Sequence, residues 1–251
     1  MSQHVAFFSD LHLPSEANSK NEQLLISYLK NLRKNHYTDL VFLGDIFDLM
    51  VGPFDFWKER HKNFFEEISA WTQNERQVYW VQGNHDFYLE DLLDQLGVQC
   101  SDNDIDISFD GKRLYLAHGD LVDQQDEKYL KWRNQTRSPA FRALLSSIPE
   151  KIAEKLIVRI GNKLSQKSRK KTQRPHPNEI EKIQSLYRSF SSEKWGHGFN
   201  GVCLGHSHID DLHIEKEHFY LNLGTWLDGS PRCALWSPSE YDYPKVEKIN
   251  L

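Results

Sequence analysis

With 251 residues, the chain is long enough to form one large domain, or one domain interrupted by an insertion. Hydrophobic residues make up 39% of the chain and aromatic residues 12%, a composition that excludes global disorder. The formal net charge of −5 argues against a dedicated nucleic-acid-binding protein, which would ordinarily be basic.

Five short apolar runs, rich in β-branched and aromatic residues, predict buried strands. In chain order they are Val5–Phe8, Leu40–Leu43, Val78–Val81, Leu114–Ala117 and Val202–Leu204. Amphipathic stretches between them, such as Glu22–Leu32 and Trp57–Trp71, predict helices. Because strands and helices alternate, we expect an α/β architecture.

Each predicted strand is followed within one or two residues by polar groups that suit a metal ion or a phosphate. These segments read, in chain order, SDLH, GDIFD, GNHD, HGD and GHSH. In α/β folds the carboxyl ends of the strands converge on one edge, where ligands bind. One such segment alone would be typical of an ordinary turn, since Asp, Asn, Gly and His are common in turns. Five of them together predict a single site.

The candidate metal ligands combine oxygen and nitrogen donors. They are Asp10, Asp45 and Asn84, which offer oxygens, and His12, His118, His206 and His208, which offer nitrogens. Such a mixed set suits Mn, Fe or Zn, whereas Mg and Ca prefer oxygen alone. Residues two apart on an extended segment point the same way, so both members of each i,i+2 pair can face one site. A carboxylate such as Asp45 can bridge two ions, which would then clamp a phosphoryl group for in-line displacement. Asp48, three residues after Asp45, is interpreted as a structural carboxylate of the loop.

Residues 124–192 differ from their surroundings, since they contain no convincing strand and look mostly helical. We expect them to form an insertion that covers the active edge, with residues 1–123 and 193–251 forming the core. Within Lys151–Arg174, nine Lys or Arg residues stand against Glu154 alone, a local balance of +8.

Two rows of residues recur at i+4 within this insertion. The apolar row is Ile148, Ile152, Leu156, Ile160 and Leu164, and the basic row is Lys151, Lys155, Arg159, Lys163 and Lys167. On one helix the two rows would lie side by side, an arrangement that suits an anionic lipid headgroup or a bilayer surface. The alternative is a solvated helix that packs its apolar side on the core. Gly161 argues against a single continuous helix.

The cysteines and the lack of long apolar runs bear on the cellular compartment of the protein. Cys100, Cys203 and Cys233 are widely spaced and odd in number, which favours a reducing cytoplasm over a disulfide framework. No signal peptide is recognisable, and no apolar run approaches the roughly 18 to 20 residues of a membrane span. We therefore expect any contact with a membrane to be peripheral, and we predict no protein partner.

The motif series from Asp10 to His208 resembles the calcineurin-like metallophosphoesterase superfamily. The resemblance implies a four-layer α/β/β/α sandwich of two mixed sheets, here with a helical lid, and two divalent metal ions. It places one ion at Asp10, His12, Asp45 and His208, and the other at Asp45, Asn84, His118 and His206. It also implies that His85 contacts phosphate or protonates a leaving group, and that Asp86 orients His85.

A finer resemblance rests on HGDLVDQQDEKYLKWRNQTRSPAFRALLSSIP, KLSQKSRKK and LGTW. These segments are similar to those of the UDP-2,3-diacylglucosamine diphosphatases of lipid A biosynthesis and their close relatives. The resemblance implies a Mn-dependent hydrolase that attacks phosphorus with a metal-bound hydroxide and releases UMP and 2,3-diacylglucosamine 1-phosphate. It implies a peripheral location at the inner face of the cytoplasmic membrane and a lid that covers the acyl chains. The substrate contacts that it implies are Asn84, His85, Tyr129, Arg159, Ser168 and Arg169.

One departure leaves the substrate open. Much of that enzyme group has Arg where this chain has His85. A phosphate leaving group needs no proton, whereas an alkoxide benefits from an acid such as a histidine. The alternatives are therefore a divergent enzyme acting on another phosphomonoester, phosphodiester or nucleotide pyrophosphate, and a non-catalytic scaffold. The complete set of candidate ligands argues against the scaffold.

Overall fold

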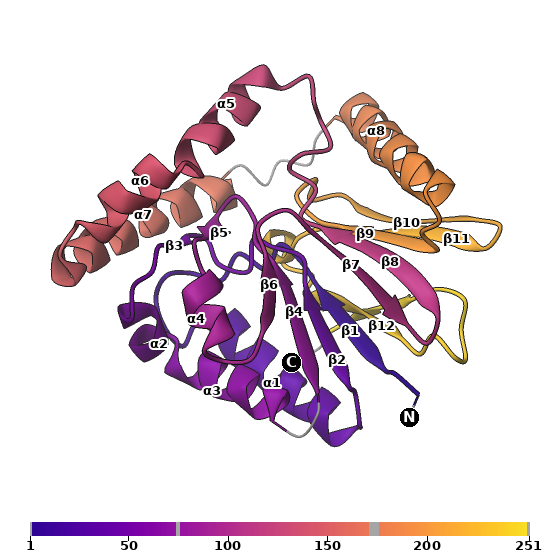
Figure 1. Cartoon of the computed structure of the whole chain (residues 1–251), viewed down its shortest axis with the longest axis horizontal. Helices are drawn as coiled ribbons and strands as arrows, with labels where there is room; N and C mark the ends of the chain where they lie inside the picture. Colours follow the sequence, from indigo (N-terminus) through magenta and orange to yellow (C-terminus); the bar gives the residue numbers. More distant parts are fainter. Residues whose placement is uncertain (1, 74–75, 171–175, 250–251) are drawn as a thin grey trace.

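The computed structural model describes residues 2–73, 76–170 and 176–249, with residues 164–170 described by their backbone alone. Two mixed β-sheets form the centre of the molecule (Figure 1). The first has the order β13-β12-β1-β2-β4-β6, with β1 (Val5–Phe8), β2 (Asp39–Phe42), β4 (Gln77–Val81), β6 (Gln99–Ser101), β12 (Arg232–Trp236) and β13 (Lys245–Lys248). The second has the order β10-β11-β9-β8-β7, with β7 (Asp104–Phe109), β8 (Lys112–Ala117), β9 (Gly201–Leu204), β10 (Asp210–Glu215) and β11 (His218–Leu223). A short pair, β3 (Met50–Val51) and β5 (Asp86–Phe87), lies apart from both.

The strands that carry the five motifs are parallel to one another within each sheet. In the first sheet β1, β2, β4 and β6 run parallel, and in the second β8, β9 and β11 do. The inner faces of the two sheets pack on each other through apolar side chains such as Phe7, Val41, Leu116 and Leu221. The observed ends of the five strands lie within one or two residues of the predicted ends. The motifs therefore follow these strands, as the sequence predicted.

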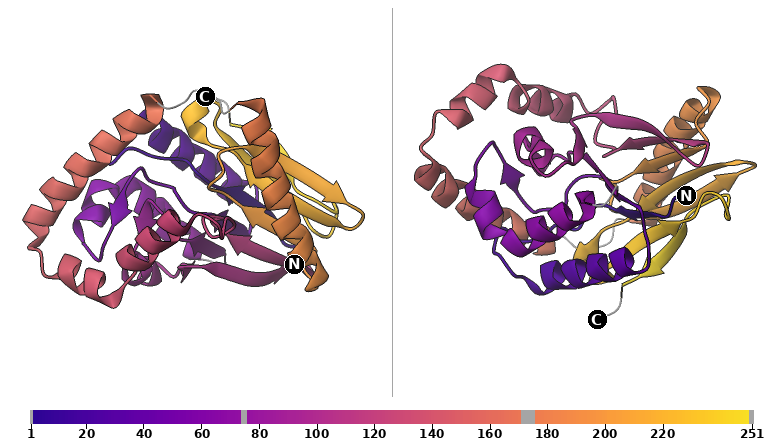
Figure 2. Two further views of the ribbon diagram at one scale, coloured as in Figure 1. Left: turned by 90° about the horizontal axis from the view of Figure 1, so that it is seen from above. Right: turned by 60° about the horizontal axis from the view of Figure 1, so that its bottom comes forward.

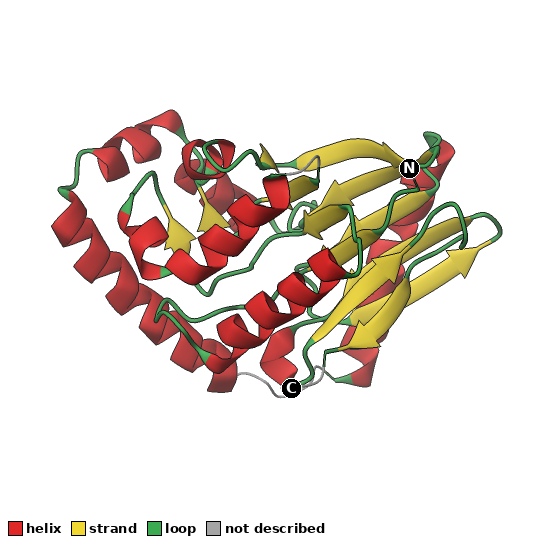
Figure 3. Ribbon diagram, turned by 90° about the horizontal axis from the view of Figure 1, so that it is seen from below, coloured by secondary structure: helices red, strands yellow, loops and turns green. Residues whose placement is uncertain are grey.

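Helices cover both outer faces of the paired sheets. On the first sheet lie α1 (Lys20–Lys34), α3 (Lys62–Thr72) and α4 (Glu90–Asp94), with α2 (Phe56–Arg60) leading into α3, and Figure 3 shows this layer from below. On the second sheet lies α8 (Pro177–Gly196), which buries Tyr187 and Trp195 against β9 and β11. The predicted four-layer sandwich is confirmed. The predicted helix 57–71 is broken at His61, where the backbone leaves the helical region between α2 and α3.

Three further helices lie outside the four layers. They are α5 (Glu127–Thr136), α6 (Pro139–Ser146) and α7 (Glu150–Lys170), and they form an arc above the first sheet (Figures 1 and 2). The insertion predicted over residues 124–192 spans this arc and most of α8, and its boundary at Ser192 falls inside α8. Since α8 belongs to a sandwich layer, we use the name lid for α5–α7 only.

The helix α7 is continuous through Gly161, contrary to the prediction that this glycine interrupts it. A Cβ at Gly161 would lie 2.3 Å from Ser15 Oγ and 3.3 Å from the Cβ of Leu49, so the glycine allows α7 to approach these loops closely. Ala153 and Ile157 make the neighbouring contacts with the core.

Of the described residues of the predicted apolar row, Ile148 packs against the core, whereas the three that follow it do not. Ile152, Leu156 and Ile160 are 58%, 48% and 42% exposed, because Ala153 and Ile157 occupy the core-facing side of α7. The alternative of a solvated helix with this row buried is therefore wrong for these three residues. None of the helices within the described ranges combines the length and apolar character needed to cross a membrane.

Candidate active site

Loops at the carboxyl ends of five strands bring the candidate ligands together. The loop after β1 carries Asp10 and His12, and the loops after β2, β4 and β8 carry Asp45, Asn84 and His118. The loop after β9 carries His206 and His208. Because the two sheets are packed together and these strands end at the same edge, side chains up to 198 positions apart meet there.

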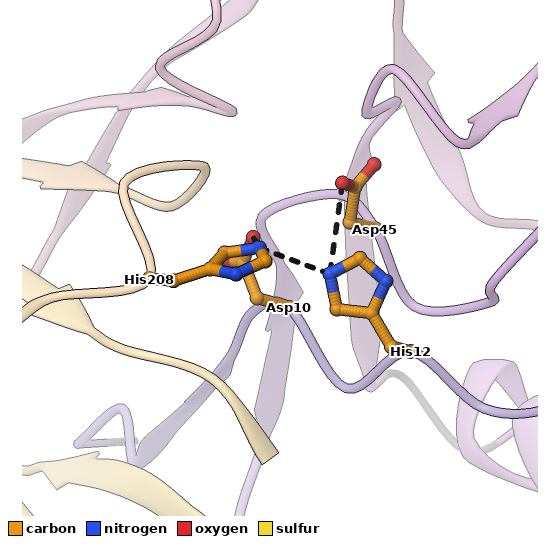
Figure 4. A group of neighbouring side chains, drawn as sticks. All are labelled: Asp10, His12, Asp45 and His208. Atoms are coloured by element: carbon orange, nitrogen blue, oxygen red, sulfur yellow. Dashed lines mark hydrogen bonds and ion pairs between the residues drawn. The ribbon is translucent and has the colours of Figure 1, made fainter. Parts of the chain in front are cut away.

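The first group consists of Asp10, His12, Asp45 and His208 (Figure 4). One ligand atom from each lies within 4.8 Å of the others, in a position where a single cation could contact all four. His12 Nε2 lies 3.0 Å from His208 Nε2, and His208 Nε2 lies 3.3 Å from Asp10 Oδ1. These are the four residues that the resemblance assigns to one ion.

The second group surrounds the side-chain oxygen of Asn84. His206 Nδ1 lies 2.9 Å and His118 Nε2 3.1 Å from Asn84 Oδ1. Asp45 lies between the groups, with Oδ1 3.5 Å from His118 Nε2 and Oδ2 3.9 Å from His12 Nε2. One carboxylate oxygen thus faces each group, the arrangement required of a bridging ligand.

The second ring nitrogen of His118 makes a hydrogen bond, and that of His12 faces a carboxylate. His118 Nδ1 donates to the carbonyl oxygen of Leu43 at 2.8 Å, which directs Nε2 toward Asn84. His12 Nδ1 lies 3.5 Å from Asp48 Oδ1, and both side chains are buried. Carboxylates and carbonyls behind metal-binding imidazoles fix the ring and raise its basicity. Asp48, interpreted from the sequence as a structural carboxylate, therefore belongs to the site. Its position three residues after Asp45 in GDIFD is the sequence signal that could have indicated a place in the site.

Five of the seven candidate ligands have a left-handed backbone. The φ values of Asp10, His12, Asp45, His206 and His208 lie between 48° and 65°. Such values are uncommon for residues other than glycine and recur at functional sites. The main chain of Asp10 is held in place by Thr225 and Trp226, whose Oγ1 and backbone N–H donate to its carbonyl oxygen at 3.0 and 3.1 Å. Residues 225 and 226 thus support the loop that carries Asp10.

The electrostatics of the buried groups favour a cation. Burial raises the pKa of Asp45, but His118, His85 and His12 outweigh burial and hold this pKa well below its usual value. Burial lowers the pKa of His118, but Asp45 and Asp10 outweigh it and raise the pKa to about 10. The centre thus attracts positive charge strongly, and its mixed oxygen and imidazole donors fit divalent ions such as Mn, Fe or Zn.

The predicted role of Asp86 in orienting His85 requires a correction. The carboxylate of Asp86 accepts backbone N–H groups of Asp45, Ile46 and Gly83 at 3.0, 2.8 and 2.7 Å, so it joins two ligand loops instead. Burial and the nearby Asp45 raise the pKa of Asp86 to about 7. His85 is oriented by Asp48, because its Nδ1–H donates to the Asp48 carbonyl oxygen at 2.7 Å. This leaves Nε2 of His85 4.0 Å from Asp45 Oδ2.

The lid residues that were predicted to contact the substrate lie in different places. Tyr129 of α5 lies beside the centre, with its ring 5.8 Å from that of His206 and its hydroxyl donating to Asp120 at 2.6 Å. Arg159 of α7 is exposed in a groove of about 650 Å³ that it shares with Arg60, Lys155 and Lys163. Ser168 and Arg169 lie outside the residues whose side chains the structure describes.

Comparisons with known proteins agree with this geometry. Residues 3–210 match the model of the calcineurin-like phosphoesterase family. A UDP-2,3-diacylglucosamine hydrolase of Aliivibrio fischeri is 27% identical over 232 residues, covering 88% of this chain and 90% of that protein. A Vibrio cholerae protein of the same name is 25% identical over 261 residues, covering 99% of each. Among solved structures, an archaeal phosphodiesterase superposes with a TM-score of 0.52 at 11% identity, covering 98% of this chain and 100% of that one, a likeness of fold.

Proposed function

Because this chain belongs to the calcineurin-like phosphoesterase family, we propose that it hydrolyses the pyrophosphate of a nucleotide-activated lipid of the UDP-2,3-diacylglucosamine type. Family membership makes the protein a metal-dependent hydrolase of phosphoesters or phosphoanhydrides. The products of the proposed reaction are UMP and 2,3-diacylglucosamine 1-phosphate. The observation that carries the proposal is the position of the two ligand groups beside a lid with an exposed apolar row.

We assign one divalent ion to the group of Asp10, His12, Asp45 and His208. A second ion is assigned to Asp45, Asn84, His118 and His206. The opposed oxygens of Asp45 support sharing of this residue, since Oδ1 faces His118 and Oδ2 faces His12. Manganese fits the mixed donor set, and iron and zinc fit it too.

Divalent ions in these positions supply activation of water and neutralisation of charge on the phosphoryl group. Asp45 holds the two ligand groups together, and His118 and His12 keep their orientation through Leu43 and Asp48. Nε2 of His85 faces the centre, and because Nδ1–H is bonded to Asp48, Nε2 would donate to a phosphoryl oxygen only from the doubly protonated ring. Water adds across the P–O–P bridge, so its oxygen remains on one product phosphate and the bridging oxygen leaves with the other.

The lid supports a lipid as the other half of the substrate. Ile152, Leu156 and Ile160 present an exposed apolar row on α7. On α5 and α6 an open groove of about 770 Å³ is lined by Leu130, Phe141 and Leu144 among others. Apolar side chains left in water on neighbouring helices suit acyl chains. The relatives that cover most of the chain are named for a diacylated nucleotide sugar.

The basic side of α7 supports a peripheral position at the inner face of the cytoplasmic membrane. Lys155, Arg159 and Lys163 are exposed beside the apolar row, and such a pairing suits anionic lipid headgroups. We expect the protein to sediment with anionic vesicles at low salt. Replacement of these three residues by Gln should release it, and binding unchanged by that variant would contradict the assignment.

The substrate is tested by incubating the purified protein with Mn²⁺ and UDP-2,3-diacylglucosamine and following UMP. UDP-N-acetylglucosamine, which has the same pyrophosphate without the two long acyl chains, is the matched control. We expect UMP from the diacylated compound and much less from the control. Release of inorganic phosphate alone, or equal turnover of the two compounds, would count against a lipid substrate.

A second candidate, hydrolysis of a phosphomonoester or phosphodiester, is favoured by one observation. His85 stands where the resembling diphosphatases commonly have Arg, and its ring is held so that Nε2 faces the centre. A histidine in this position can protonate an alkoxide leaving group. This candidate predicts turnover of small alkyl or aryl phosphates at rates comparable with that of the lipid.

A further inference from the structure

Arg133 in α5 and Arg137, the residue that caps the end of this helix, attach the lid to loops of the active site. Arg133 donates through Nε to Asp120 Oδ2 at 2.8 Å and through Nη2 to the carbonyl oxygen of Asp102 at 2.9 Å. Arg137, four residues later, forms an ion pair with Asp102 through Nη1. Its Nη2 donates to the carbonyl oxygen of Gly83 at 2.6 Å. The second arginine thus reaches from the lid into the loop that follows β4.

Gly83, whose carbonyl Arg137 holds, is also tightly constrained on its other sides. The N–H of Gly83 donates to Asp86 Oδ1 at 2.7 Å. A Cβ at Gly83 would lie 2.2 Å from Asp45 Oδ1, so this residue lies directly against the shared carboxylate. The residue that follows is Asn84, whose Oδ1 lies between the nitrogens of His118 and His206. The carbonyl of Gly83 belongs to the peptide bond that leads into Asn84.

We infer that Arg137 is a positioning residue for Asn84, and that the lid thereby controls the affinity of the ion assigned to Asn84, His118 and His206. Arg137 fixes the Gly83–Asn84 peptide and so the direction of the amide oxygen. The other ion, assigned to Asp10, His12, Asp45 and His208, shares only Asp45 with this loop. The inference rests on the proposed metal ligands and not on the identity of the substrate.

An arginine suits this position better than a lysine does. Its planar guanidinium contacts Asp102 and the Gly83 carbonyl with different nitrogens, and it stacks 4.3 Å above the ring of Phe87. The side chain is only 8% exposed, so its direction is set by these three contacts. A lysine offers a single ammonium, which cannot contact Asp102 and the Gly83 carbonyl and also stack on the ring.

The coupling works in both directions. If docking of α5 raises the affinity for this ion, binding of the ion must stabilise the docked α5 by the same factor. Hydrogen exchange of the α5 amides should therefore slow when Mn²⁺ is added. The exchange effect should be smaller when Arg137 is replaced.

The test compares Mn²⁺ binding to the metal-free full-length chain in four variants, with free Mn²⁺ followed by electron paramagnetic resonance. Asn84→Ala identifies the binding step that belongs to the second ion. Arg137→Met removes both hydrogen bonds while keeping much of the side-chain length, and Arg137→Lys is the milder change. Arg142→Met is the matched control, since Arg142 of α6 pairs with Glu90 and Asp91 and lies over Tyr88 without reaching a ligand loop.

We expect Arg137→Met to weaken the step identified by Asn84→Ala by about tenfold, the lower end of the range for partners behind metal ligands. The other step should change little, Arg137→Lys should fall in between, and Arg142→Met should bind as the wild type does. Three results would overturn the inference: two unchanged steps in Arg137→Met, equal weakening of both steps, or the same loss in Arg142→Met. If Asn84→Ala itself leaves both steps intact, the metal assignment fails instead.

Discussion

The ring of His85 and the main chain of Asp48 are joined by a 2.7 Å hydrogen bond in which Nδ1–H donates to the carbonyl oxygen. A carbonyl oxygen can only accept, so the proton on Nδ1 is fixed whatever the charge of the ring. Nε2 is therefore the nitrogen that faces the centre, 4.0 Å from Asp45 Oδ2. The side chain of the same Asp48 lies 3.5 Å from His12 Nδ1, so one residue is next to two histidines of the centre through different atoms.

Replacement of His85 by Ala should separate the two candidate functions. A positioned acid typically contributes about 10²- to 10⁴-fold to the rate when the leaving group needs a proton. We expect a loss in that range for an alkyl phosphodiester and a much smaller loss for a pyrophosphate, because a phosphate leaves without a proton. The measurement is kcat for both compounds in the variant and the wild type. Equal losses on the two compounds would argue against a role for His85 in proton transfer.

Asp45→Ala should nearly abolish hydrolysis, because it empties the position between the two ligand groups. The loss should exceed the roughly 10- to 100-fold that is typical for residues behind the ligands. Activity of the wild type should disappear with a chelator and return with Mn²⁺, whereas the variant should not recover. Wild-type turnover in Asp45→Ala would contradict the bridging assignment.

Asp48→Asn should weaken the ion held by His12 while leaving the fold intact. The change keeps the shape of the side chain but removes the charge that faces His12 Nδ1. We expect metal affinity to fall by about 10- to 100-fold. Metal titration together with thermal unfolding distinguishes this effect from general destabilisation. If affinity stays unchanged, the contact with His12 has no role in metal binding.

The sequence was sufficient to predict which side chains meet at the strand ends, but not which groups stand behind them. The seven candidate ligands could be brought to one site because each follows a predicted strand and strand ends converge, whereas the set of Asp10, His12, Asp45 and His208 came from the family resemblance. The link from Asp48 to His12 could not be predicted, because it depends on the conformation of two loops and not on spacing. The role of Asp86 was misassigned for the same reason: its carboxylate accepts three backbone N–H groups, which no pattern of side chains indicates.

The strands also divide into those that the sequence was sufficient to predict and those that it was not. Buried apolar runs were sufficient to predict β1, β2, β4, β8 and β9, since both faces of these strands are covered. The edge strands β7, β10 and β13 alternate or are largely exposed, so their apolar pattern is weak. The helix α8 was assigned to the insertion because amphipathic helices of a lid and of a sandwich layer have similar sequences.

Leu156→Asp should reduce turnover of the diacylated substrate without affecting a soluble one. Leu156 is 48% exposed in the middle of the apolar row, so the change should cost little stability. Interaction with an acyl chain would be lost together with the apolar surface. The measurement is kcat/KM for UDP-2,3-diacylglucosamine and for a small aryl phosphate. Ser192→Asp, at an exposed position of α8 outside the lid, serves as a control for one added negative charge, and equal losses in the two variants would exclude a specific apolar contact.

Gly161→Ala should loosen the lid from the core although alanine favours helices. The new methyl group would lie 2.3 Å from Ser15 Oγ, so α7 or the Ser15 loop must shift. We expect faster hydrogen exchange in α7 and a lower melting temperature, with an added Ser15→Gly change restoring part of both. A variant as stable as the wild type would show that the Ser15 loop can move without loss of stability.

The left-handed backbone of five ligands restricts what evolution or a protein engineer can place there. Asp, Asn and His are the non-glycine residues that most readily adopt this conformation, and Asp and His are also common metal-binding side chains. Sterics and coordination chemistry thus select from the same short list of amino acids. A β-branched residue at one of these positions would distort the loop as well as remove a donor, so the neighbouring ligands would be displaced too. Exchanges within the list, such as Asp for Asn, are therefore the ones that alter the metal while preserving the architecture.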